Sequence, residues 1–267
     1  MKKILLIDSH NLIHRARFGF GAGPHKIYFN FFRMLMGELK RHTPDAVYIV
    51  DEGKPVSSIM LMPDYKANRK KLQDPDFQRE KREIFETIKE MSGFTYIRHP
   101  NYECDDVIGF LANHYQNDDV TIVSTDTDFI QLISENIKVW NPRKKEYFEQ
   151  FPVDYVTWKS LRGDGADNIK GVSGIGDKRA HLLAADSSTL QKFLDSKTER
   201  REQFEIAKKL ITLKNVDVAG LEIRQSPFDE EKLFLQFSMR KFKTIIGNAW
   251  PKWKMNFTAA GGKNDFE

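Results

Sequence analysis

The chain has 267 residues, of which 40% are hydrophobic and 30% charged, which is the composition of a globular protein with a sizeable core. Its formal net charge of +4 is mildly basic and fits a polyanionic partner. The single cysteine, Cys104, excludes an internal disulfide and a cysteine-rich zinc site, and no apolar run approaches the roughly 18 residues of a membrane span, so a reducing cytosol is the expected compartment.

The first half of the chain alternates short apolar runs with segments of helical periodicity. Such runs, rich in Ile, Val and Leu, are typical of the buried strands of a parallel sheet. We therefore predict an α/β fold over residues 1–150, with a mostly parallel central sheet flanked by helices. Strands are predicted at 3–8, 46–50, 94–98 and 120–124, helices at 27–41, 83–92 and 104–116, and a hairpin at 137–140 and 146–148.

The segment 54–82 interrupts this alternation, because it combines three prolines with many cations and has weak apolar periodicity. We predict that it leaves the sheet as a helical arch or a flexible loop. A tyrosine among cations can stack on a nucleic-acid base while the cations clamp phosphates, although a solvated charged loop is the simpler alternative. The residues in question are Tyr65, Lys66, Arg69, Lys70 and Lys71.

From about residue 152 the apolar pattern becomes helical, and a helical region is predicted over 151–249, with helices at 199–213 and 229–246. Within it, the turn GVSGIG at 171–176 is typical of a helix-hairpin-helix element. Glycines let the backbone approach a phosphate, and amides at the following helix start donate to it. The tail 250–267 lacks periodicity, and we expect part of it to be disordered.

The residues of that turn are Gly171, Val172, Ser173, Gly174, Ile175 and Gly176, followed by Lys178 and Arg179. The two basic residues add positive charge just inside the next helix. The predicted function is to hold the backbone of a nucleic-acid duplex without reading its bases.

Acidic residues follow the predicted strands at the points where the strands end. Open α/β sheets carry their functional residues just beyond the carboxyl ends of the strands, so these acids should meet at one edge. Crowded carboxylates repel one another, and divalent cations with oxygen ligands relieve that repulsion. The predicted metal ligands are Asp8, Asp51, Glu103, Asp105, Asp106, Asp126, Asp128, Asp164 and Asp167.

Any one of these acids alone is explained more simply as a helix cap, but four separate acidic clusters favour a metal centre. Two Mg²⁺ or Mn²⁺ ions about 3.5–4 Å apart can activate a water and stabilise a leaving oxyanion in phosphodiester hydrolysis. No histidine pair has the spacing of a zinc site. The sequence therefore predicts a metal-dependent phosphoryl-transfer enzyme, in which cations from 54–82 offset charge on the scissile phosphate.

These motifs resemble those of the flap endonuclease and 5′–3′ exonuclease family, especially its small phage members, including the phage ribonuclease H type. The resemblance covers about residues 3–181. It is carried by ECDD at 103–106, STDTDF at 124–129 and GDGADNIKGVSGIG at 163–176, while PDYKANRKK at 63–71 looks like the family's helical arch.

The resemblance implies two metal sites. Asp8, Asp51, Glu103 and Asp105 would surround the first, with Asp106 nearby, and Asp126, Asp128, Asp164 and Asp167 would hold the second. It also implies that Lys66 and Arg69 act on the scissile phosphate and that Tyr65 stacks on a base. GVSGIG would bind the uncleaved duplex, in some family members together with a potassium ion. The implied substrates are DNA with a 5′ flap or free 5′ end and an RNA–DNA primer duplex.

We thus expect a monomeric 5′ nuclease of replication or repair, in bacterial or phage-infected cytosol. Two alternatives remain at this stage. A junction-binding accessory protein would gain little from concentrating acids near DNA. A single-strand ribonuclease of the related PIN type would not need the basic segment 54–82 and the GVSGIG turn. The aromatic and acidic residues of 250–267 suggest contact with a single-strand-binding protein or a clamp.

Overall fold

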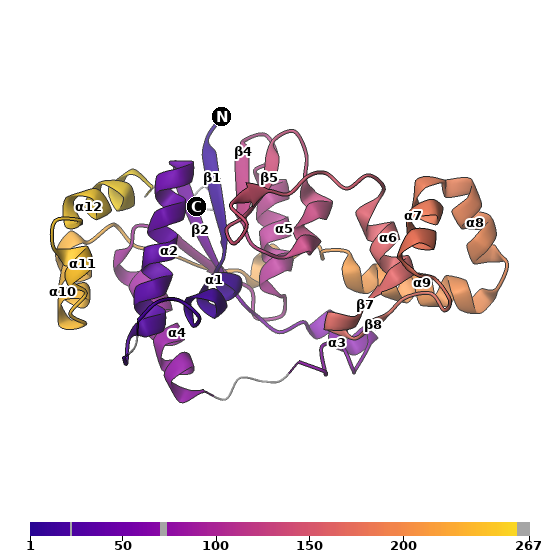
Figure 1. Cartoon of the computed structure of the whole chain (residues 1–267), viewed down its shortest axis with the longest axis horizontal. Coiled ribbons are helices and arrows are strands. Elements are labelled where there is room, and N and C mark those ends of the chain that lie inside the picture. The colour runs from indigo at the N-terminus through magenta and orange to yellow at the C-terminus, as the bar shows by residue number, and fades with distance from the viewer. Residues whose placement is uncertain (22, 70–73, 261–267) are drawn as a thin grey trace.

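A seven-stranded sheet forms the centre of the molecule, in the order β6-β5-β4-β1-β2-β3-β9 (Figure 1). The computed structural model describes residues 1–21, 23–69 and 74–260. The edge strands β6 (Glu146–Tyr147) and β9 (Glu222–Gln225) are antiparallel to their neighbours. The parallel strands are β1 (Lys3–Asp8), β2 (Ala46–Asp51), β3 (Thr95–Arg98), β4 (Asp119–Val123) and β5 (Ile137–Asn141). The predicted α/β class, with a mostly parallel sheet, is confirmed.

Helices cover both faces of this sheet. Leu5, Ile7 and Ile49 project into one core with α1 (Ser9–Ala16), α2 (Lys26–His42) and α4 (Pro75–Met91). Leu6 and Val50 project into the opposite core with α5 (Cys104–His114). Successive residues of a strand point to opposite faces, so the parity of a residue decides which core its side chain joins. The same parity governs the residues just past the strand ends.

The predicted helical region has a hydrophobic core of its own, which includes Trp158, Leu161 and Phe204. It extends from the sheet at the right of Figure 1. The short helix η1 (Thr127–Leu132) precedes it in the chain. The paired strands β7 (Gly163–Asp164) and β8 (Ile169–Lys170), with η2 (Gly165–Asp167) between them, join its first two helices. Its helices are α6 (Tyr155–Arg162), α7 (Asp177–Ala185), α8 (Ser187–Asp195) and α9 (Thr198–Ile211).

After α9 the chain returns to the sheet, which differs from the predicted helical region ending at 249. Strand β9 pairs with β3, and η3 (Val218–Gly220) precedes it. Helices α10 (Glu230–Met239), α11 (Lys243–Ile246) and α12 (Trp250–Ala259) then pack on the core of α2 and α4. The physical reason is burial of aromatic rings, because Phe237, Trp253 and Phe257 all join that core.

Residues 250–259 are therefore helical, whereas the sequence pattern predicted an irregular tail; residues 261–267 lie outside the described part. The segment 54–82 contains α3 (Val56–Leu61), a turn through residue 69, and the start of α4, with 70–73 outside the described residues. Among the described residues, no helix is long and apolar enough to cross a membrane.

Candidate functional site

The candidate site is a cavity of about 250 Å³ at the carboxyl ends of the parallel strands. It lies where β1, β2 and β4 end and α5 begins, which is the edge that the strand-end rule predicted. Its lining is rich in acids and also contains cations and histidines. The lining residues are Asp8, His10, Asn11, His14, Glu52, Lys66, Arg69, Glu103, Cys104, Asp105 and Asp126.

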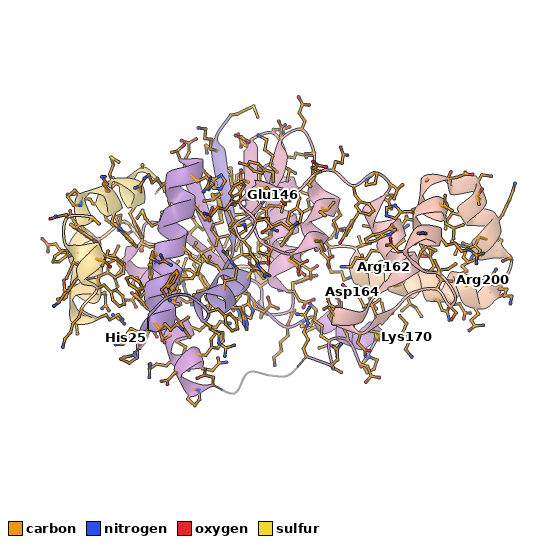
Figure 2. All side chains as sticks on the ribbon, in the orientation of Figure 1. His25, Glu146, Arg162, Asp164, Lys170 and Arg200 are labelled. Carbon is orange, nitrogen blue, oxygen red and sulfur yellow. The ribbon has the colours of Figure 1, made fainter. Side chains whose placement is uncertain are left out.

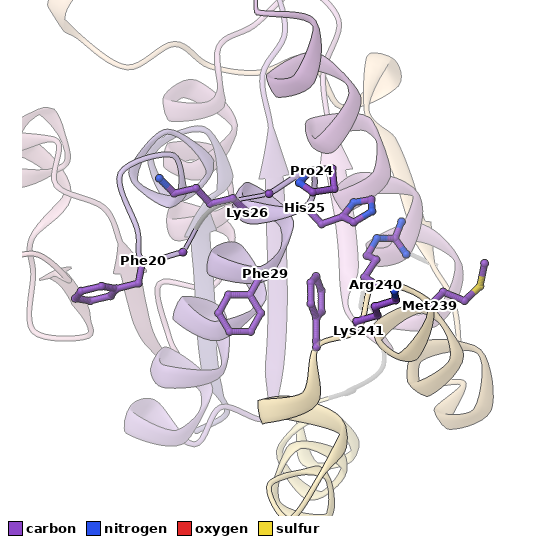
Figure 3. Close-up of a pocket in the computed structure, with 11 residues that line it drawn as sticks. Phe20, Pro24, His25, Lys26, Phe29, Met239, Arg240 and Lys241 are labelled. Atoms are coloured by element: carbon purple, nitrogen blue, oxygen red, sulfur yellow. The ribbon is translucent and has the colours of Figure 1, made fainter.

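A larger cavity, of about 600 Å³, lies between the start of α2 and the α10–α11 turn (Figure 3). Phe29 and Phe242 both line it, with ring centroids 5.1 Å apart. The Arg240 side chain points toward His25 (Figure 3). Among the described residues, no Asp or Glu lines this cavity. The convergent acids therefore identify the smaller cavity as the candidate site, despite its size.

Asp8 begins the acidic site at the end of β1. Its carboxylate caps α1 by accepting from the Asn11 backbone N–H at 3.0 Å, and it accepts from the Ser124 hydroxyl at 2.7 Å. Burial raises its pKa and nearby Asp126 adds to this, while the bonds from Asn11 and Ser124 act in the opposite direction. Asp8 is thus both an N-cap and a member of the site.

The first turn of α5 supplies a compact group of acids, namely Glu103, Asp105 and Asp106. Carboxylate oxygens of all three lie within 4.8 Å of one another. Glu103 and Asp106 form a capping box, and Asp106 also accepts from the Lys214 backbone N–H at 2.7 Å. Burial raises the pKa of Asp105 well above its usual range, and the neighbouring Glu103 and Asp106 raise it further.

A second group combines Asp128 on η1 with Asp164 and Asp167 near the β7–β8 pair, again with carboxylate oxygens within 4.8 Å. Figure 2 labels Asp164 between the sheet and the helical region. The two groups are neighbours, because Glu103, Asp105 and Asp106 share a narrow gap with Asp128 and Asp167. The structure thus brings together residues that are separated by more than 20 positions in the chain.

Lys159 on α6 lies inside the second group and was not predicted. Its Nζ is 2.7 Å from Oδ2 of Asp164, and it also pairs closely with Asp128. Its side chain is only 5% exposed. Burial alone would lower the pKa of this ammonium, but Asp128 and Asp164 outweigh burial and raise it. Lys159 is not part of a recognisable sequence motif. Only the packing of α6 brings it next to the acids.

Lys66 and Arg69 connect the two acidic groups from the turn after α3. Lys66 Nζ is 2.5 Å from Oε1 of Glu103 and 3.5 Å from Oδ2 of Asp167, and Arg69 also pairs with Asp167. The Lys66 backbone has a φ of +56°, an uncommon left-handed conformation for a residue with a side chain. Burial opposes the charge of Lys66, but Asp105 and Glu103 raise its pKa.

Tyr65 is placed differently from the prediction. The residue is 8% exposed and packs with Ile169 and Leu210 instead of standing free for base stacking. Its hydroxyl donates to Oε2 of Glu103 at 2.9 Å. A tyrosine with an acceptor for its hydroxyl can be buried at little polar cost, which explains the difference. Lys70 and Lys71 lie outside the described residues.

The end of β2 also differs from expectation. Asp51 lies outside the cavity, and its carboxylate accepts from the Tyr96 hydroxyl at 2.9 Å. Its neighbour Glu52, which was not among the predicted ligands, lines the cavity. Burial raises the pKa of Glu52 to about 7, and the charge of Glu103 contributes.

The GVSGIG segment forms a turn between β8 and α7. Val172 and Ile175 are buried in the core of the helical region, so only their backbone is available to a ligand. Gly174 is exposed with a φ of +76°, a conformation that glycine adopts freely. Helix α7 has no side-chain cap at Gly176. Lys178 and Arg179 are exposed on its first turn, as predicted.

The two acidic groups fit divalent cations. Every charged donor in them is a carboxylate oxygen, which is what Mg²⁺ and Mn²⁺ prefer. Cationic side chains enter both groups, Lys66 beside Glu103 and Lys159 between Asp128 and Asp164. The carboxylates of both groups therefore gather around positive charge.

Comparison with known proteins gives consistent matches. The family model described as "5'-3' exonuclease, N-terminal resolvase-like domain" matches residues 3–159. The chain is 30% identical over 212 residues to a 5′-3′ exonuclease of Mycoplasmopsis pulmonis, covering 73% of this chain and 70% of that protein. It is 31% identical over 208 residues to the thermostable DNA polymerase I of Thermus filiformis, covering 72% of this chain and 25% of the polymerase.

Among solved structures, the bacteriophage T5 D15 flap endonuclease, crystallised with DNA and metal ions, aligns with a TM-score of 0.68. The alignment covers 96% of this chain and 98% of that one at 17% sequence identity, so it shows a shared fold. The chain spans about a quarter of the matched polymerase but most of the matched exonuclease.

Proposed function

The chain belongs to the 5′–3′ exonuclease and flap endonuclease family and is a metal-dependent nuclease, and we propose that its substrate is a nucleic-acid junction with a free 5′ end. The observation that carries this proposal is the convergence of two acidic groups with Lys66, on the segment 54–82, at one edge of the sheet. This arrangement suits hydrolysis of a phosphodiester whose strand approaches that segment. The products would be short 5′ fragments.

We propose that two Mg²⁺ ions, replaceable by Mn²⁺, are held by these acids. Bound there, they would supply an activated water and charge stabilisation for the leaving oxygen. The first set would be Asp8, Asp51, Glu103 and Asp105, with Asp106 nearby, and the second Asp126, Asp128, Asp164 and Asp167. Asp51 does not line the cavity, so it would act on the first metal through a bound water.

Lys66 and Arg69 are proposed to act on the scissile phosphate. In the structure both cations pair with Asp167, and Lys66 also contacts Glu103. An ammonium beside the metal-binding acids is close enough to contact a phosphate bound there. Because its pKa is raised, Lys66 keeps its charge at neutral pH and can stabilise developing negative charge.

The GVSGIG turn is proposed to hold the uncleaved duplex and a K⁺ ion. Exposed Ser173 and Gly174, together with the amides at the start of α7, suit phosphate contacts that carry no sequence information. Lys178 and Arg179 would add electrostatic attraction. Specificity would then follow from the shape of the junction, which accommodates both DNA flaps and RNA–DNA primers.

The deciding experiment incubates a 5′-labelled flap duplex with the protein in Mg²⁺ or in EDTA, beside the variant Asp126→Asn, Asp128→Asn. We expect the wild-type protein to cut near the junction only in Mg²⁺. The variant should not cut, but it should bind the flap nearly as tightly as the wild-type protein. Tight binding without cutting in Mg²⁺ and in Mn²⁺ would contradict the proposal and favour the accessory-protein function. An unstructured RNA of equal length separates the proposal from a single-strand ribonuclease.

A further inference from the structure

We infer that Lys81 of α4 is a positioning residue of the proposed nuclease site. Its ammonium lies next to the cavity of that site and contacts two groups, the carboxylate of Asp51 and the imidazole of His10. The inference rests on the proposed function, because it concerns the same reaction. It adds a functional cation at the end of the segment 54–82, where the sequence motifs indicated none.

Lys81 occupies a core-facing position of an amphipathic helix. Phe77, Ile84 and Ile88 of α4 are buried in the core that this helix shares with α1 and α2. Lys81 is four positions after Phe77 and four before the buried Phe85, so it lies on the same face of the helix. Only 21% of its side chain is exposed. A cation in such a position requires partners, because an unpaired buried ammonium is costly.

The first partner of Lys81 is Asp51, at the end of β2. Nζ of Lys81 lies 3.6 Å from Oδ1 of Asp51, while Oδ2 accepts from the Tyr96 hydroxyl at 2.9 Å. The ammonium and the hydroxyl therefore contact different oxygens of one carboxylate, and together they fix its orientation. Each carboxylate oxygen can accept a further bond. Lys81 thus orients the acid that is proposed to act on the first metal through a bound water.

The second partner is His10 of α1, which lines the cavity. Nζ of Lys81 lies 2.8 Å from Nε2 of His10. An ammonium can only donate, so Nε2 must accept, and the imidazole must be neutral with its proton on Nδ1. Burial lowers the pKa of His10 to about 3, and the charge of Lys81 is the next cause, which agrees with a neutral ring. Lys81 thereby selects one of the two tautomers of His10.

Lys81 differs in this respect from Lys66 and Arg69, which line the cavity themselves. It is not part of that lining, and it acts through Asp51 on one side and His10 on the other. Among the described residues, the His10 ring makes no other hydrogen bond, so its Nδ1 proton remains for a ligand or a water. Loss of the ammonium would therefore disturb the site without removing a group that touches the substrate.

The first test determines the tautomer of His10 by long-range proton–nitrogen NMR on the metal-free protein at neutral pH. The loss of a signal in His10→Gln identifies this histidine. We expect the Nδ1–H tautomer in the wild type and in Lys81→Arg, which keeps a donor. In Lys81→Met, which removes the charge, the Nε2–H tautomer that free histidine prefers should appear.

An Nε2–H tautomer in the wild type, or the same tautomer in the wild type and Lys81→Met, would overturn the inference. The wild-type spectrum needs no variant, so the inference stays testable if Lys81→Met does not fold. Thermal melting in EDTA shows whether each variant is folded.

The second test measures single-turnover cleavage and binding of a 5′ flap in Mg²⁺. Lys81→Met should slow cleavage about 10- to 100-fold and change flap binding less than about threefold, as expected for a residue that orients others. Lys81→Arg should restore most of the lost rate. Arg82→Met is the matched control, because Arg82 is an exposed cation at the next position of α4.

The two tests separate this inference from the proposed function. A wild-type rate in Lys81→Met, or an equal loss of rate in Arg82→Met, would overturn the positioning role. A wild-type protein that shows the expected tautomers but never cleaves would sink the proposed function and leave the contact between Lys81 and His10 standing.

Discussion

Nζ of Lys159 lies 2.7 Å from Oδ2 of Asp164, and the same ammonium pairs with Asp128 on another element. A buried monovalent cation therefore sits between two acids proposed to bind a divalent one. Removing one partner of a buried ion pair leaves an uncompensated charge, which costs more than the pair itself contributes. Lys159 is thus expected to matter most when no metal is bound.

Lys159→Met should destabilise the metal-free protein by about 3–5 kcal/mol, because Asp128 and Asp164 lose their buried cation. In Mg²⁺ the loss should be smaller, since the metal supplies positive charge to the same acids. Urea unfolding in EDTA and in Mg²⁺ measures both values. The control is Lys192→Met on the exposed surface of α8, which should change neither. Equal losses with and without Mg²⁺ would contradict this role.

The acids of the site were largely predictable from the sequence, while their partners were not. Asp8 follows a buried strand, and Glu103 begins a helix, so local pattern and parallel topology were enough to bring them together. Lys159 lies on an ordinary amphipathic helix whose rotation relative to the sheet is set by tertiary packing. Glu52 could have been found by extending the alternation of β2 by one residue.

Lys66→Ala should slow single-turnover cleavage about 10²-fold and change flap binding by less than about threefold, because its charge is needed mainly when the phosphate develops charge. Pre-steady-state cleavage and filter binding on the same flap separate the two effects. Lys54→Ala is the matched control, since Lys54 is an exposed cation on the same segment. An unchanged single-turnover rate would remove Lys66 from the proposed chemistry.

The stabilisation that Mg²⁺ gives the protein should grow as pH rises from 5 to 8. Burial raises the pKa of Asp8, Asp105 and Asp128, and it raises that of Glu52 to about 7, so at low pH the folded metal-free protein retains protons that Mg²⁺ must displace. The sign follows from linkage: a raised carboxylate pKa gives stability at low pH that is lost as pH rises through the folded pKa.

The readout is the difference in melting temperature between Mg²⁺ and EDTA at each pH. This difference is used because His10, whose burial lowers its pKa to about 3, changes the stability of the metal-free protein in the opposite direction. A difference that is constant, or that shrinks toward pH 8, would show that these carboxylates do not bind the metal. Ca²⁺ in place of Mg²⁺ tests whether the effect is one of charge.

The sheet centre was predicted from local patterns, but its edge and the C-terminal helices were not. Strand β9 has one partly buried apolar residue, Ile223, and its pairing with β3 bridges more than 120 positions. Helix α12 has three aromatic residues without a regular apolar stripe, and it is fixed by packing on Phe237. Long-range burial decides such segments, and periodicity alone does not reveal it.

Lys178→Ala should weaken binding to the duplex and lower the salt dependence of the binding constant by about one phosphate contact, a slope change of roughly 0.9. The reason is the position of Lys178, exposed on the first turn of α7 beside Gly174 and the uncapped helix start. Binding of flap and blunt duplex over a range of KCl concentrations measures the slope, with Lys192→Ala on α8 as control. Cleavage at saturating protein should stay at the wild-type rate, because the turn positions duplex and does no chemistry. An unchanged salt dependence in Lys178→Ala would show that the duplex contacts another face of the molecule.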